Sequence, residues 1–311
     1  KNEFLHKLDS LSSSKGFGII KSTPYGNTIL TDLALKILKN EKLGKSNTTD
    51  FLSISYSSTD YIGHQYGPHS MEIYDTYIKL DKDIGKLLSY INNNIGKENT
   101  IVFLTADHGV SSEPSKLLEY NIPAGYFSKD KMLKNLTTYL KDYFNWPNDE
   151  IKASEYIANF SNNQLFLDHD FINTNLGFDK KRIFTELCSD YLLQQEGVKN
   201  TFTAYQMHHY QYSHSTHAKI QQGFNHKRSG DVIIELEPGW IGDGWEEGGT
   251  THGSSHSYDT HVPLIFWGAE VPNGNTARLV NVKDIAPTVS AILEISFPNG
   301  CTGVPLTEII D

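Results

Sequence analysis

The stretch FLSISYSSTDYIGH, residues 51–64, decides the fold together with IVFLTADHG, residues 101–109. Each begins with a short run of apolar, β-branched and aromatic residues and ends in polar residues that include an aspartate and a histidine. Phe51–Ser57 and Ile101–Ala106 are typical of buried strands. Between them, Met71–Ile91 has apolar side chains at steps of three and four residues, which predicts a long amphipathic helix. Strand, helix and strand form a βαβ unit, so we expect parallel strands.

Two aspartates fall at the ends of these predicted strands. Ligands of open parallel sheets gather at the carboxyl ends of the strands, where Asp60 and Asp107 lie. Asp60 and His64 are four residues apart, so a helical turn would place both on one face, as a chelating pair requires. Asp107 and His108 are adjacent and can converge only if the backbone turns sharply, which Gly109 permits.

A third candidate segment lies far downstream. His252 sits in GGTTHG, residues 248–253, a flexible stretch that could bring a distant imidazole to the site. Carboxylate oxygen and imidazole nitrogen suit zinc, and two Asp-His sets suggest two ions. Ligands spread from residue 60 to residue 252 indicate a catalytic site on a large scaffold rather than a structural zinc clip. The sequence therefore predicts a metal-dependent hydrolase.

The rest of the chain divides by composition into a core and an insertion. Residues 1–112 and 228–311 are predicted to form an α/β core, the second part with strands at 231–237 and 263–267 and a helix at 282–293. Residues 113–227 are rich in Asn, Tyr, Lys and Gln and are predicted to be an inserted subdomain. It should hold helices at 129–144 and 180–195 and a strand at 164–168.

Bulk composition excludes several classes of protein. The 311 residues are 38% hydrophobic, enough for a large core. The net charge of −10 gives no electrostatic basis for binding nucleic acid or an anionic membrane. No run approaches the roughly 18 apolar residues of a membrane helix. Because the chain opens on Lys1 and residues 1–9 resemble the middle of a helix, we expect it to have been cut from something longer.

Other polar clusters have simpler interpretations. The histidine-rich stretch lies in polar, Tyr- and Gln-rich surroundings that predict an exposed loop; its members are His208, His209, His214, His217 and His226. The segment from Ser254 to His261 contains serine, histidine and aspartate, yet no G-x-S-x-G motif of a serine hydrolase occurs in the chain. Asp259 and His261 are therefore expected to support His252 structurally.

Six separated motifs together resemble the alkaline phosphatase superfamily, and most closely the phosphate-irrepressible type of bacterial alkaline phosphatase. They occur in the family's order across nearly the whole chain. The motifs are SYSSTDYIGHQYGPHS (55–70), DTYIKLDKDIGKLL (75–88), VFLTADHG (102–109), KRSGDV (227–232), GTTHGSSHSYDTHVPLIFWG (249–268) and DIAPTVSAIL (284–293). The resemblance is weakest from about residue 113 to residue 225.

The resemblance implies a three-layer α/β/α sandwich with a mostly parallel sheet, and a two-zinc phosphatase that hydrolyses monoesters through a covalent phospho-enzyme. By motif, Asp60, His64 and His252 would hold one zinc, and Asp107 and His108 would contribute to the second. The family's remaining aspartate ligand and its threonine or serine nucleophile are not identifiable here, so the catalytic residue is expected upstream of Lys1. Such phosphatases are exported, which implies a periplasmic or secreted protein acting on a small phosphorylated substrate.

Three alternatives stay open. A phosphodiesterase or nucleotide pyrophosphatase of the same superfamily uses similar ligands. A catalytically inactive fragment could hold zinc through the five ligands without a nucleophile. The third alternative is a binding or structural protein without metal, which predicts that Asp60→Ala and His252→Ala leave bound zinc unchanged.

Overall fold

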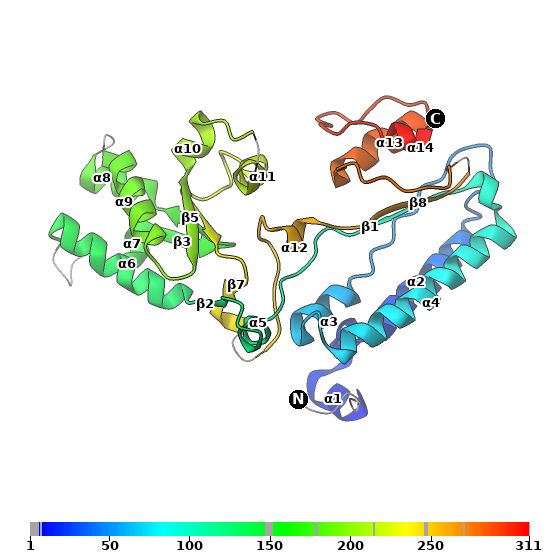
Figure 1. Ribbon diagram of the computed structural model, residues 1–311, viewed down its shortest axis with the longest axis horizontal. Helices are drawn as coiled ribbons and strands as arrows, with labels where there is room; N and C mark the ends of the chain where they lie inside the picture. Colours follow the sequence, from blue (N-terminus) through cyan, green and yellow to red (C-terminus); the bar gives the residue numbers. More distant parts are fainter. Residues whose placement is uncertain are drawn as a thin grey trace. The chain divides into compact units, whose positions relative to one another are not determined.

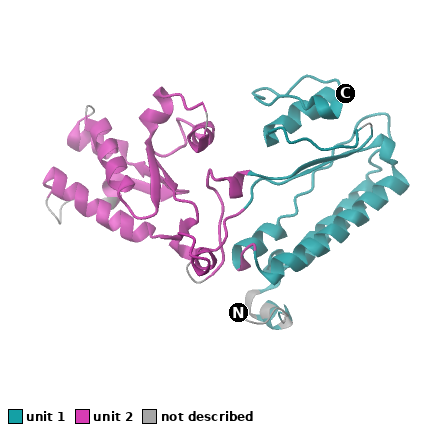
Figure 2. Ribbon diagram, viewed as in Figure 1, with its two compact units in different colours: residues 1–65, 69–109, 261–311 teal, residues 66–68, 110–260 magenta. Residues whose placement is uncertain are grey.

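The computed structural model describes residues 6, 8–146, 152–177, 180–213, 215–245, 248–269 and 271–310. The chain separates into two compact units (Figure 2). Unit 1 comprises residues 1–65, 69–109 and 261–311, and unit 2 comprises residues 66–68 and 110–260. Most of the segment expected to form a helix at residues 1–9 lies outside the described residues. In the described part of the chain, no helix has both the length and the apolarity to cross a membrane.

Unit 1 is built on two long helices that lie side by side, α2 and α4 (Figure 1). Its other elements are shorter, and two of them, β1 and β8, are strands. The bounds are α1 Leu8–Lys15, η1 Phe17–Ser22, α2 Pro24–Asn40, α3 Ser58–Tyr66, α4 Met71–Asn94, η2 Lys97–Asn99, β1 Ile101–Thr105, β8 Leu264–Gly268, η5 Val282–Asp284, α13 Ile285–Ile292 and α14 Thr307–Ile310. The predicted helix at 71–91 is thus confirmed as α4, and the Ser70 hydroxyl caps it by accepting a hydrogen bond from the Ile73 amide.

The core of unit 1 lies between these helices and the β1–β8 pair. Leu38 of α2 and Leu87 of α4 belong to one buried cluster, against which Val102 and Trp267 of the two strands pack. β1 and β8 are antiparallel, with Val102 opposite Trp267. Val102 and Trp267 thus pack on the helical cluster, whereas Ile265 of β8 is 55% exposed.

The strand predicted at Phe51–Ser57 is not formed, which corrects the expectation of a parallel pair with β1. Residues 51–56 have no regular secondary structure, although Leu52 and Ile54 pack against the helical cluster and Phe51 lies beside Phe103, with 6.4 Å between ring centroids. The apolar pattern correctly indicated that part of the segment packs against a core, because Leu52 and Ile54 are partly buried. A strand also needs a hydrogen-bonded partner, and no described strand pairs with this one.

Unit 2 contains a four-stranded antiparallel sheet in the order β3-β4-β6-β5 and a separate parallel pair, β2–β7. The strands are β2 Gly125–Phe127, β3 Ile157–Ser161, β4 Gln164–Leu167, β5 Val198–Thr203, β6 Val232–Leu236 and β7 Trp240–Gly242. The helices are α5 Pro114–Glu119, α6 Lys129–Phe144, α7 Ala153–Tyr156, α8 His169–Leu176, α9 Lys181–Leu193, α10 Ala204–His209, α11 Ser215–Gly223, η4 Asp243–Trp245 and α12 Ser257–Thr260. The predicted helices at 129–144 and 180–195 are confirmed as α6 and α9.

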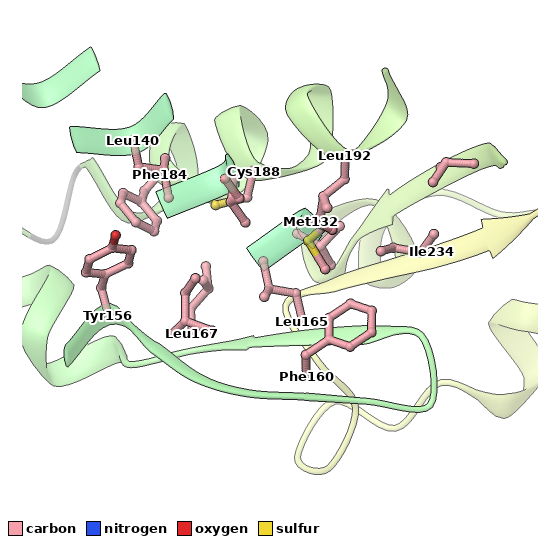
Figure 3. Packing of buried hydrophobic residues seen from close by; sticks show 14 of the residues in the cluster. Met132, Leu140, Tyr156, Phe160, Leu165, Leu167, Phe184, Cys188, Leu192 and Ile234 are labelled. Carbon is pink, nitrogen blue, oxygen red and sulfur yellow. The ribbon is translucent and has the colours of Figure 1, made fainter. Parts of the chain in front are cut away.

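The main core of unit 2 lies between α6, α9 and one face of this sheet (Figure 3). Met132 and Leu140 of α6 and Leu192 of α9 meet Leu165 and Ile234 of the sheet there. The opposite face of β6 is also covered, since its Ile233 belongs to a second buried cluster with Phe202 and Met207. Because β6 pairs with β4 and β5, the compact unit runs past residue 227, where the sequence had suggested that the insertion ends.

Candidate metal centre

Asp60 and His64 lie one turn apart on the short helix α3. Asp60 is in the first turn, where a carboxylate is favoured by the helix dipole, and His64 is in the last. The distance from Asp60 Oδ1 to His64 Nε2 is 3.4 Å. The spacing in the sequence therefore places the carboxylate oxygen and the imidazole nitrogen side by side, as predicted.

Asn27 of α2 fixes the start of that helix. Its side-chain oxygen accepts a hydrogen bond from the Ser58 amide (3.3 Å), and its Nδ2 donates to Thr59 Oγ1 (3.1 Å). Asn27 is almost fully buried, so these bonds also satisfy a polar group that would be costly to bury alone. The position of Asp60 thus depends on a residue in another helix that the sequence reasoning did not single out.

Asp107 and His108 lie just after β1, separated from it by Ala106, and bring a second carboxylate and imidazole close to Asp60. His108 Nε2 lies 3.5 Å from Asp107 Oδ2 and 3.9 Å from Asp60 Oδ1. The other ring nitrogen, Nδ1, is 2.9 Å from the carbonyl oxygen of Gly109, which can only accept, so Nδ1 donates. This bond orients the ring and leaves Nε2 directed toward the carboxylates, the arrangement usual for histidines that bind metal.

The four unit 1 residues thus form one cluster of two carboxylates and two imidazoles. Its members differ in exposure, from 23% of the side chain for His64 and 25% for His108 to 41% for Asp60 and 89% for Asp107. Asp60 Oδ1 is central, because it lies within 4 Å of both imidazoles. This donor set fits a zinc ion, and partial exposure leaves room for a substrate.

His252 belongs to unit 2 and lies in a segment without regular structure, residues 248–256. The segment is held on both sides of the histidine. Thr250 is fully buried and its hydroxyl donates to the carbonyl oxygen of Ser111 (2.9 Å). After the histidine, the amides of Gly253 and Ser254 donate to Asp259 Oδ2 at 3.0 and 2.7 Å.

The two residues expected to support His252 have different surroundings. Asp259 is 3% exposed and contacts the backbone directly after the histidine, which fits the expected role. His261 is exposed and belongs to unit 1. Its supporting role stays a prediction.

The histidine-rich stretch is partly helical rather than a loop. His208 and His209 end α10, and His217 lies on α11. His208, His209 and His226 are exposed, as expected, and His214 lies outside the described residues. The prediction of a loop was wrong at these helical positions. For His208 and His209, the capping box formed by Thr203 and Gln206 starts a helix that composition alone does not reveal.

The early threonines are used structurally. Thr23 Oγ1 donates to the carbonyl oxygen of Ile20, and Thr28 Oγ1 donates to Asp83 Oδ2 at 2.8 Å. Both hydroxyls therefore have hydrogen-bonding roles within the fold.

Comparison with known proteins identifies the family. The family model for type I phosphodiesterase / nucleotide pyrophosphatase matches residues 12–259, well over half of the chain. The chain belongs to this family. A relative from Myroides odoratus named calcium-transporting ATPase is 37% identical over 99% of this chain, and alkaline phosphatase PhoV of Synechococcus elongatus is 38% identical over 96%.

Solved structures agree with this membership. The crystal structure of wild type alkaline phosphatase PafA superposes with a TM-score of 0.84 at 33% identity and covers 94% of this chain. The alkaline phosphatase-like α/β fold predicted from the motifs is therefore confirmed. This family member spans about half the length of the proteins it matches, namely 55% of the Myroides relative, 52% of PhoV and 54% of PafA.

Proposed function

We propose that this chain carries the zinc-binding part of an alkaline phosphatase-type enzyme that hydrolyses phosphate monoesters through a covalent phospho-enzyme. The observation that carries the proposal is the convergence of Asp60, His64, Asp107 and His108 within unit 1, with ligand atoms 3.4 to 3.9 Å apart. Family membership and the match to alkaline phosphatases PafA and PhoV support the same reaction class. Export to the periplasm or the medium is part of the proposal.

The ligands divide into two sets in this proposal. Asp60, His64 and His252 hold one zinc ion, and Asp107 and His108 contribute to the second. When bound, the ions supply Lewis-acid stabilisation of the phosphoryl oxygens and activation of the attacking and leaving groups. The chain's own contribution is to fix the ligands: the His108 ring is oriented by the Gly109 carbonyl, and Asp60 by the start of α3. No nucleophile is assigned among its residues.

A second candidate function is hydrolysis of phosphodiesters or nucleotide pyrophosphates. The matching family model, described as type I phosphodiesterase / nucleotide pyrophosphatase, favours it. The two reactions use the same kind of metal centre and differ in what surrounds the non-bridging phosphate oxygens. The distinction therefore depends on residues other than the five ligands.

Zinc binding by the purified chain tests the proposal. Equilibrium dialysis followed by elemental analysis should find zinc bound stoichiometrically to the wild-type chain. His108→Ala should bind less zinc, because the ring is held against both Asp60 and Asp107. His209→Ala is the matched control, since it removes an exposed histidine at the end of α10. Equal zinc in wild type and His108→Ala would show that the bound zinc does not depend on His108 and would reject the proposed metal centre.

Turnover is measured separately with the zinc-loaded chain. A phenyl phosphate monoester and the matched bis-phenyl diester distinguish the two reaction classes, and faster diester hydrolysis would reject the first choice. Stoichiometric zinc without any turnover would favour a metal-binding module that lacks its nucleophile.

A further inference from the structure

Glu235 is a buried acid in the middle of an apolar strand. It lies on β6, where all five residues are buried, and its side chain is only 2% exposed. Its neighbours Ile234 and Leu236 face the main core of unit 2, so Glu235 is on the opposite face of the strand, as is Ile233. Burying a carboxylate is costly unless it is paired and hydrogen-bonded, so its partners should explain its presence.

The partners of Glu235 come from three other segments. Asn200 Nδ2 on β5 donates to Oε2 (2.7 Å), and the hydroxyl of Ser255 donates to Oε1 (3.0 Å). Two further side chains lie slightly farther away, with Lys199 Nζ at 3.6 Å and His217 Nε2 of α11 at 3.8 Å. Hydrogen bonds therefore reach both carboxylate oxygens.

The electrostatic balance keeps Glu235 ionised. Burial by itself would raise its pKa, but hydrogen bonds from Asn200, Thr216 and Ser255, with the charge of Lys199, outweigh burial and hold the pKa below its usual value. An ionised carboxylate makes stronger hydrogen bonds than a neutral group, so the bond from Ser255 to Glu235 holds this residue firmly to β6.

Ser255 lies three residues after the candidate ligand His252. The next residue, His256, is buried and its Nε2 lies 2.9 Å from the carbonyl oxygen of Leu236, also on β6. Asp259 accepts from the amides of Gly253 and Ser254. All four residues from 253 to 256 are thus bonded to β6 or to Asp259.

These bonds restrict residues 253–256, which have no regular secondary structure of their own. Gly253 has φ of 112°, a conformation open to glycine and strained for other residues. Asp259 also keeps acceptor capacity, because its Oδ1 is buried and has no hydrogen-bond partner among the described residues. Ordering a flexible segment when a ligand binds costs conformational entropy, and a segment held in advance avoids much of that cost.

We propose that Glu235 and Asp259 are positioning residues that hold the segment carrying His252 in its metal-binding conformation. Glu235 fixes the segment to the rigid sheet through Ser255, and Asp259 fixes the two peptides directly after the histidine. The proposal rests on the proposed function, in which His252 binds zinc. Partners that orient a metal ligand typically contribute 10- to 100-fold to metal affinity, which is the effect expected here.

Hydrogen exchange of the metal-free chain tests the positioning directly. Asp259→Asn should speed amide exchange at Gly253 and Ser254, and Glu235→Gln should speed exchange across residues 252–256. Asp231→Asn is the matched control: this acid directly precedes β6 but bonds His169 and the Leu167 amide instead. Unchanged exchange at residues 252–256 in both variants would overturn the proposal.

Zinc titration then tests whether positioning serves the site. Glu235→Gln and Asp259→Asn should each weaken zinc binding about 10- to 100-fold, while Asp231→Asn binds as wild type does. Ser255→Ala removes the hydroxyl that donates to Glu235 and leaves the buried carboxylate in place. It replaces Glu235→Gln in the test if that variant does not fold. Cobalt substitution adds a spectroscopic readout, because altered visible bands show a changed coordination geometry that a purely structural role would leave intact.

The outcomes separate the two proposals. If His252→Ala does not lower zinc affinity, the assignment of His252 fails, whatever the exchange data show. If His252→Ala lowers it but Glu235→Gln, Ser255→Ala and Asp259→Asn bind zinc normally, the metal centre stands and the positioning role is overturned.

Discussion

Two neighbouring leucines on α9 allow a quantitative test of what stabilises unit 2. Leu192 is fully buried in the core shown in Figure 3, and Leu193 is 47% exposed at the same end of the helix. Each can be changed to alanine, which raises helix propensity slightly in both cases. The two variants therefore differ mainly in the apolar contacts that they lose.

The expected magnitude follows from burial. Removing a fully buried leucine side chain to alanine costs about 2–5 kcal/mol, because the transfer free energy is lost and a cavity remains. For Leu192 we expect about 3 kcal/mol, since its side chain is packed in a cluster that includes Met132 and Leu165. Leu193→Ala should cost less than about 1 kcal/mol, because half of its surface is already in water.

Urea unfolding followed by tryptophan fluorescence measures the difference. Trp146 and Trp240 pack against the same core and report on unit 2. With a slope of about 1–3 kcal/mol per molar urea, Leu192→Ala should shift the midpoint down by about 1–3 M, and Leu193→Ala by less than about a third of that shift. Zinc affinity measured well below the transition should stay unchanged in both. Equal midpoint shifts for the two variants would refute the packing argument.

Two further predictions concern acid stability and helix capping. Because the pKa of Glu235 is depressed in the folded state, its stabilisation is present above the ordinary value of 4.5 and is lost as the pH falls below it. Urea midpoints recorded from pH 6 to pH 3 should therefore fall less steeply in Glu235→Gln; an identical fall would contradict this. Thr203→Ala removes the capping box of α10 and should cost about 1 kcal/mol in urea unfolding, whereas the exposed Thr138→Ala on α6 should cost nothing. Equal costs would exclude a capping contribution.

The sequence predicted best those elements whose pattern is local. The α4 and α6 helices have apolar side chains at helical spacing, so the residues that form each helix also determine its buried face. The strand at Phe51–Ser57 could not be decided in this way. Its apolar and aromatic run indicates burial, but strand formation also requires a partner elsewhere in the chain, and periodicity contains no information about pairing.

In the candidate site, too, local spacing predicted some contacts, whereas contacts between distant segments could not be predicted from it. The four-residue spacing of Asp60 and His64 was enough to predict their proximity, because a single helix determines it. The approach of His108 to Asp60 depends on how β1 and α3 are placed, which only the motif resemblance could suggest. Asn27 went unnoticed, since one asparagine in a helix has no distinctive pattern.

Glu235 has a signal in the sequence that indicates its buried network. An acid between Ile234 and Leu236 in an otherwise apolar strand is rarely buried without a reason, because its desolvation must be compensated. Such an acid predicts a hydrogen-bonded network even when the partners cannot be named.

The proposed metal binding and the proposed turnover can be tested separately, and this decides which experiment is most informative. The proposed ligands lie on helix α3, just after β1 and in the segment at 248–256, and each has its own local support in Asn27, Gly109 or Asp259. None of these supports requires a nucleophile. A turnover assay alone therefore cannot distinguish a misassigned metal site from a correct site that lacks its reacting hydroxyl. Zinc affinity across the ligand and positioning variants can, because it responds to the ligands and their supports whether or not catalysis occurs.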